Sequence, residues 1–107
     1  MTIRPVAELD ATLADVNDEL SYAPQSADFY RGCAAALEWI TGQRRVGPVD
    51  VDGSATADES GVHGQLAAAV AMLHGERPTP APLVRAYVSG VEATLAWVLG
   101  QTDEPPL

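Results

Sequence analysis

The chain has 107 residues, 47% of them hydrophobic and 20% charged, and its formal net charge is −9 at pH 7. This length and this apolar content predict one folded domain, residues 1–107, rather than a disordered chain. The acidity argues against a nucleic-acid-binding surface, because phosphates are bound by clustered Lys and Arg. We therefore expect no nucleic acid partner.

The lack of a recognisable signal peptide and the single cysteine indicate a cytoplasmic protein. The first residues, Met1 to Pro5, lack the apolar run of a signal peptide, and no stretch is long enough to span a bilayer. Cys33 is the only cysteine, which excludes a disulfide within the chain and a metal cluster with several thiolate ligands. We expect a cytoplasmic protein that does not contact membranes.

Helical periodicity predicts a first helix pair over residues 5–45. Apolar residues recur at three- and four-residue steps in its first helix, which predicts one buried stripe. The remaining positions form an acidic, solvated face with Glu8, Asp10, Asp15, Asp18 and Glu19. The second helix is apolar on most sides, with Phe29, Cys33, Leu37 and Ile40 in one stripe and Gly32, Ala35, Ala36 and Trp39 in another. Such a helix needs two neighbours or a partner chain, and Gly42 or Gly47 would cap its end.

A second helix pair is predicted over residues 57–100. Gly, Pro, Ser and Asp crowd residues 47–58, which predicts a flexible linker. Thr56 and Glu59 have the spacing of a capping box and place the next helix start near Ala57. The core stripe of the last helix is expected to be Val84, Val88, Val91, Leu95 and Val98. Gly100 would cap this helix, and residues 101–107 are expected to be a disordered tail.

The second and fourth predicted helices resemble each other. Residues 32–43 align without gaps to residues 90–101. The identical pairs are Gly32/Gly90, Ala35/Ala93, Leu37/Leu95, Trp39/Trp97, Gly42/Gly100 and Gln43/Gln101, and Phe29 matches Tyr87 upstream. Both Trp residues of the chain thus stand before a Gly-Gln ending. This repetition indicates a duplicated helix pair, or convergence on one packing role.

Two related helix-hairpin repeats predict an all-α, four-helix arrangement with the second and fourth helices central. These two helices carry more apolar surface than the outer helices can readily cover. A symmetric homodimer would bury the remainder. We expect its interface to contain Gly32, Ala36, Trp39, Gly90, Thr94 and Trp97.

The histidines do not predict a metal site. His63 and His74 share one helix face but lie roughly 16 Å apart along the axis, too far for one ion to bridge. Cys33 lies on an apolar stripe without a neighbouring His, which is typical of a buried cysteine rather than a nucleophile. We expect Glu38 and Glu92 to be exposed rather than catalytic. The sequence therefore predicts no catalytic residue, no metal and no cofactor.

The linker contains part of a calcium-loop pattern. With Gly53 as the turn glycine, Asp50, Asp52 and Glu59 occupy liganding positions of an EF-hand loop. The first liganding position would then be Pro48, which has no side-chain oxygen. A solvated acidic linker is the preferred interpretation.

Apolar helices without gathered reactive groups predict a non-enzymatic helical-bundle protein that homodimerises and acts on an unidentified protein partner. A second hypothesis is an acidic antagonist or DNA mimic whose first helix binds a basic protein surface. A third is a bundle with a small-ligand or enzymatic pocket between the helix pairs. Salt-sensitive binding would favour the acidic antagonist, and salt-insensitive binding the apolar interface.

Overall fold

The computed structural model describes residues 4–22, 27–44, 47–49, 58–78 and 83–104. These residues form four α-helices and no strand: α1 (Val6–Tyr22), α2 (Ala27–Ile40), α3 (Glu59–Leu73) and α4 (Arg85–Val98). The prediction of an all-helical chain with four helices is confirmed. None of these helices is both long and apolar enough to cross a membrane.

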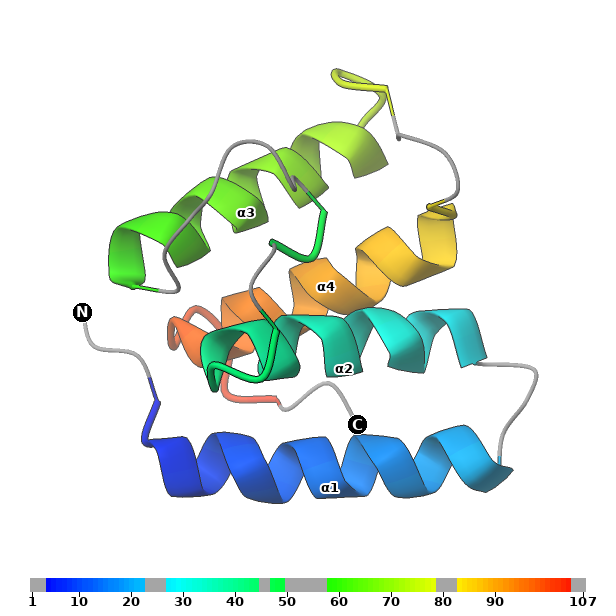
Figure 1. Cartoon of the computed structure of the whole chain (residues 1–107). Helices are drawn as coiled ribbons and strands as arrows, with labels where there is room; N and C mark the ends of the chain where they lie inside the picture. Colours follow the sequence, from blue (N-terminus) through cyan, green and yellow to red (C-terminus); the bar gives the residue numbers. More distant parts are fainter. Residues whose placement is uncertain (1–3, 23–26, 45–46, 50–57, 79–82, 105–107) are drawn as a thin grey trace.

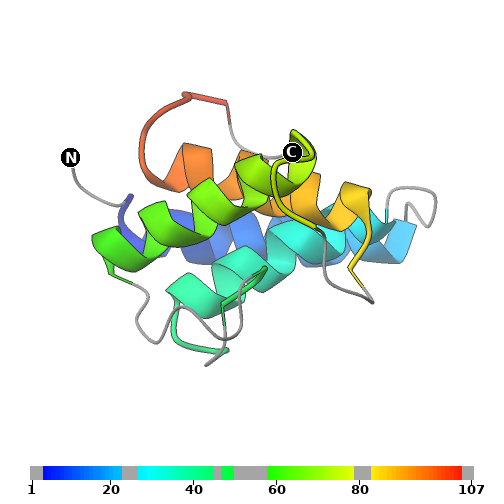
Figure 2. The same ribbon diagram turned by 90° about the horizontal axis from the view of Figure 1, so that it is seen from above.

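The helices stack in the order α1, α2, α4, α3 (Figure 1). α2 packs between α1 and α4, and α4 packs between α2 and α3. Seen from above, α3 lies in front of the inner pair (Figure 2). α2 and α4 are therefore the central helices, as the sequence predicts, because each is apolar on more than one side and needs two neighbours.

The core contains most of the apolar stripes expected from the helical spacing. Leu9, Leu13 and Val16 of α1 are buried, and so are Val88, Val91, Leu95 and Val98 of α4. The prediction fails at Val84, whose side chain is 45% exposed. Val84 is the N-cap of α4, so its backbone is extended and its side chain does not continue the stripe.

Glycine ends three of the helices in the left-handed conformation that L side chains rarely adopt. The φ angles are +85° at Gly42 and +74° at both Gly75 and Gly100. Each glycine is followed by a backbone N–H that reaches back to a carbonyl five residues earlier: Gln43 N to Glu38 O (2.8 Å), Glu76 N to Ala71 O (2.9 Å) and Gln101 N to Ala96 O (2.9 Å). This is the Schellman pattern, and it selects Gly42 rather than Gly47 as the cap of α2.

α3 begins later than the expected capping box implies. Its N-cap is Asp58, whose Oδ1 accepts a hydrogen bond from Gly61 N at 2.8 Å. An Asp at this position satisfies one of the free N–H groups of the first turn and complements the helix dipole. Thr56 lies outside the described residues.

Parts of the expected linker and tail are held by hydrogen bonds instead. Gly47, Pro48 and Val49 are buried, and Val49 N donates to the Gln65 side chain at 3.1 Å. At the other end, Thr102 O accepts a hydrogen bond from Arg4 Nη2 at 3.0 Å. These polar contacts order segments whose composition alone predicted mobility. The rest of the linker, residues 50–57, and residues 105–107 lie outside the described part of the chain.

The α2–α4 contact is a backbone-to-backbone approach at two glycines. A Cβ atom on Gly32 would overlap Tyr87 O and would lie 2.9 Å from the Tyr87 carbonyl carbon. A Cβ atom on Gly90 would overlap Phe29 O in the same way. Only glycine permits this separation, because the obstructing atoms are main-chain atoms that no rotamer change can move.

We predict opposite effects for two Gly→Ala substitutions within helices. Gly32→Ala should lower the free energy of unfolding by about 1–3 kcal/mol, because the methyl group forces α2 and α4 apart. Gly64→Ala should raise it by about 0.5–1 kcal/mol, because that position faces open space and alanine is the better helix former. Urea unfolding followed by circular dichroism measures both, and equal effects at the two positions would contradict the close crossing.

Candidate functional site

The six residues expected at an intermolecular interface are all buried inside the single chain. Ala36 and Thr94 are completely buried, and the exposed fractions of Trp39 and Trp97 are 1% and 3%. Gly32 and Gly90 are buried where α2 crosses α4. In this fold these residues are covered by the chain's own helices and do not form an outer surface.

The two glycines make equivalent contacts. Gly32 lies against the carbonyl of Tyr87 and the backbone nitrogen of Val91, which is 3.1 Å from the Cβ position. Gly90 lies against the carbonyl of Phe29 and the nitrogen of Cys33, again at 3.1 Å. Tyr87 and Phe29 are partners in the sequence alignment, and so are Val91 and Cys33. The crossing therefore has a local two-fold relation in which the aligned residues exchange places.

A thiol and a hydroxyl are enclosed at this crossing. Cys33 Sγ donates a long hydrogen bond to Gly90 O at 3.6 Å. The Thr94 hydroxyl lies beside the thiol and has no other hydrogen-bond partner. Burial raises the pKa of the Cys33 thiol from 9.0 to about 11, against a smaller lowering by the Thr94 hydroxyl. The thiol is thus protonated at neutral pH, which makes it a poor nucleophile and a poor metal ligand.

A second polar cluster fixes the segment that follows α2. The Tyr87 hydroxyl donates to Pro48 O at 2.8 Å and lies beside the Arg44 guanidinium. Burial raises the pKa of Tyr87, and Arg44 opposes this shift. Both Tyr87 and Arg44 are half-buried, so the cluster joins α4 to the chain that leaves α2 rather than forming an open site.

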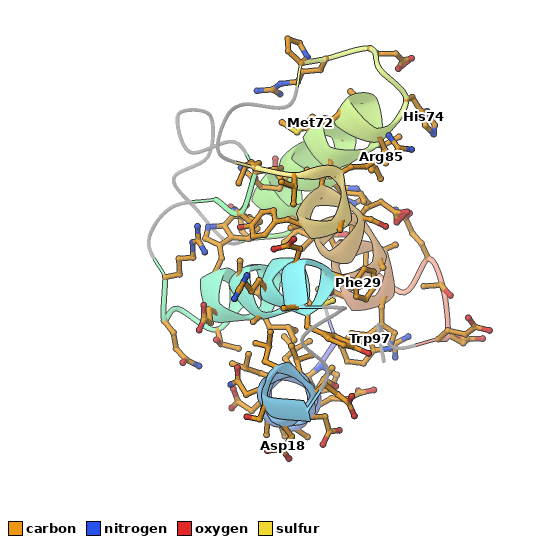
Figure 3. The ribbon with its side chains drawn as sticks, turned by 90° about the vertical axis from the view of Figure 1, so that its right-hand side faces the viewer. Asp18, Phe29, Met72, His74, Arg85 and Trp97 are labelled. Atoms are coloured by element: carbon orange, nitrogen blue, oxygen red, sulfur yellow. The ribbon has the colours of Figure 1, made fainter. Side chains whose placement is uncertain are left out.

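Arg4 joins the two ends of the fold, a role that sequence reasoning missed. Its Nε donates to Trp97 O at 2.6 Å, and its guanidinium carbon lies 4.8 Å from the centroid of the Trp97 ring. Figure 3 shows the Trp97 side chain on the flank of α4. The guanidinium supplies donors and positive charge to the carbonyl end of α4. No local pattern could reveal this contact, because the two residues are 93 positions apart.

α1 carries an acidic face, which we define as Glu8, Asp10, Asp15, Asp18 and Glu19. Asp18 lies on the side of α1 away from α2 (Figure 3), and every member except the half-buried Glu19 is exposed. At about 100° per residue, Glu8, Asp15 and Glu19 fall within roughly 40° of one another, and Asp18 adjoins them. α1 contains no basic residue. The side of α1 that carries these carboxylates is therefore mostly exposed.

The acidic face has few counter-charges. Glu8 forms a 3.4 Å ion pair with Arg4, and the other four carboxylates make no ion pair within the described residues. Exposed pairs of this kind contribute little to folding stability. The face therefore keeps most of its negative potential available to solvent or to a partner.

Both histidines lie on α3 or at its end, outside any cluster of metal ligands among the described residues. His63 and His74 are both exposed, and no group of three or more potential ligands occurs among the described residues. At the end of α3, Arg85 rather than the His74 imidazole donates to a carbonyl, Leu73 O, at 2.8 Å. Asp50 and Asp52 of the calcium-loop pattern lie outside the described residues.

Comparisons of the chain with protein-family models, with curated proteins and with solved structures give no significant match. Its function is therefore inferred from the arrangement of its own residues.

We predict that stability falls with pH as the Cys33 thiol ionises in the unfolded chain. The folded state holds this proton up to about pH 11, and the unfolded chain releases it near 9.0. The stabilisation is therefore complete below pH 9 and is lost between 9 and 11, with a slope of at most about 1.4 kcal/mol per pH unit. Urea midpoints measured from pH 7 to 10 should decline for the wild type.

Cys33→Ala provides the control, because it removes the titrating group and should flatten the curve below pH 10. The raised pKa of Tyr87 acts in the same direction, but from its ordinary value of 10.0 upward. Curves for the wild type and for Cys33→Ala that fall in parallel between pH 9 and 10 would show that the thiol is not enclosed.

Proposed function

We propose that the chain is a non-enzymatic helical-bundle protein that acts by protein–protein interaction, and that the acidic face of α1 binds a basic surface of another protein. The observation that carries this proposal is the set of five carboxylates, four exposed and one half-buried, on an outer helix that contains no basic residue. This choice favours the acidic-antagonist hypothesis over an apolar binding surface.

Two physical arguments support the acidic face over an apolar one. Among the described residues, Val84 is the only large hydrophobic side chain that is exposed, so the apolar surface is already covered. The carboxylates beside Asp15, in contrast, lie close together and lack local neutralisation. A partner that supplies Lys or Arg side chains would replace mutual repulsion with attraction, which accelerates association and sets specificity.

We also propose that the fold consists of two related helix hairpins, α1–α2 and α3–α4. The alignment of residues 32–43 with residues 90–101, the equivalent Schellman endings at Gly42 and Gly100 and the equivalent glycine contacts support this pairing. Homodimerisation belongs to the same proposal. Because the expected interface residues are buried in the monomer, a dimer that uses them must rearrange how the two hairpins pair.

A labelled peptide rich in arginine serves as the probe for the acidic face. We predict that the peptide shifts the backbone amide resonances around Asp15 and Asp18 of the ¹⁵N-labelled protein and leaves the resonances of α3 unchanged. The triple substitution Asp15→Asn, Asp18→Asn and Glu19→Gln should weaken binding by about tenfold or more at low salt. The effect should shrink as salt screens the charges.

A matched variant separates the face from net charge. Glu76→Gln, Asp103→Asn and Glu104→Gln also remove three carboxylates, all of them exposed and outside α1. We expect this variant to bind with about the wild-type affinity, apart from the small long-range effect of net charge. Equal weakening by the two triple variants, or binding that salt does not change, would contradict the proposal.

A further inference from the structure

We infer that the α2–α4 interface is also a binding surface for a second copy of this chain: two chains exchange hairpins, so that α2 of each packs on α4 of the other. This inference rests on the proposed pairing of α1–α2 and α3–α4, and not on the acidic face of α1. Under this inference, the six residues expected at a dimer interface form the α2–α4 contact within the monomer and the same contact between chains in the dimer.

The crossing of α2 and α4 is self-complementary. Gly32 receives the carbonyl of Tyr87 and Gly90 receives the carbonyl of Phe29, and the Cβ positions lie 2.9 Å and 3.0 Å from the respective carbonyl carbons. A contact in which equivalent residues occupy each other's places is the geometry of a two-fold interface between identical subunits. The chain contains such an interface within one molecule.

Each helix hairpin lies within one half of the chain, and the α2–α4 contact that joins the two halves is the most extensive helix–helix contact of the fold. Residues 4–49 contain α1 and α2, and residues 58–104 contain α3 and α4. α1 packs on α2 and α3 packs on α4, while the halves meet chiefly where α2 contacts α4. Each half therefore retains its own hairpin when the other half is supplied by a different chain.

The remaining contacts between the halves survive the exchange as well. Arg4 reaches Trp97 and Thr102 in the other half, and Val49 N reaches the Gln65 side chain. The Tyr87 hydroxyl reaches Pro48 O across the same boundary. In an exchanged dimer each of these contacts forms twice, between chains instead of within one chain. The exchange therefore retains each of these contacts between described residues.

The surface of α2 at the crossing fits a second copy of this chain. A partner of α2 at this surface must present a backbone without a side chain where Gly90 meets Phe29, and a carbonyl that accepts a hydrogen bond from the buried Cys33 thiol. The surface of α4 meets both conditions, and a second copy carries that same α4. The closed monomer has the advantage of high effective concentration, so the exchanged dimer should form when chains refold at high protein concentration.

Co-refolding of the full-length chain tests the exchange. Unlabelled and ¹⁵N-labelled proteins are mixed, unfolded in urea and refolded together, and native mass spectrometry records the species. We expect a dimer of mixed mass whose share rises when refolding is carried out at about a hundredfold higher concentration. After dilution it should persist, because separation requires the α2–α4 contact to open. Mixing the two proteins without unfolding should give no mixed dimer in the same time.

Complementation between two damaged chains gives a sharper test. Gly32→Leu and Gly90→Leu each damage the crossing in every monomer. An exchanged heterodimer has two crossings: one pairs the intact Gly32 of one chain with the intact Gly90 of the other, and the second carries both leucines. One undamaged crossing is therefore present in the heterodimer and none in either monomer. Co-refolding the two variants should therefore yield a heterodimer and more helical signal than the average of the two refolded separately.

Three results would overturn the inference: a co-refolded mixture equal to that average, a wild-type chain that is monomeric after refolding at every concentration, or a dimer that forms without unfolding and dissociates at once on dilution. The last result indicates a surface dimer. None of them affects binding of the arginine-rich peptide to the acidic face, so the two proposals fail independently.

Discussion

The absence of a side chain at Gly32 and Gly90 sets the distance between α2 and α4, and the rest of the fold depends on it. With main chain against main chain, the neighbouring side chains interlock, and Cys33 and Thr94 are enclosed without contact with water. Close packing of this kind gives the crossing its stability, because many weak contacts add up over two helices. The outer helices then need to cover only one remaining side each.

Much of this arrangement is predictable from local sequence pattern. The spacing of Leu9, Leu13 and Val16 predicts the buried side of α1. The sequence also predicts the cap at Gly100, but it leaves Gly42 and Gly47 open for α2, and the structure selects Gly42. These features are local, since periodicity and left-handed glycine act within a few residues. The alignment also brings together the residues that make equivalent contacts at the crossing.

Contacts between distant segments are not predictable in this way. Arg4 binds the end of α4, and Val49 is held by the Gln65 side chain, so composition misjudged the linker start and the tail. The six residues expected at a dimer interface are buried within the chain, because spacing cannot tell whether two apolar helices of one chain face each other or a partner. Here they face each other. The apolar faces of α2 and α4 are therefore buried within the chain, and the carboxylates of α1 lie on the outside.

The contact between the two glycines can be measured directly by nuclear Overhauser spectroscopy on the uniformly labelled full chain. The Cβ positions of Gly32 and Gly90 lie 3.1 Å from Val91 N and Cys33 N, so each glycine's α protons should show strong cross-peaks to the corresponding amide proton. Finding both cross-peaks would establish the backbone crossing. A spectrum in which all four helices are formed but neither cross-peak is present would contradict it, and the two-fold relation with it.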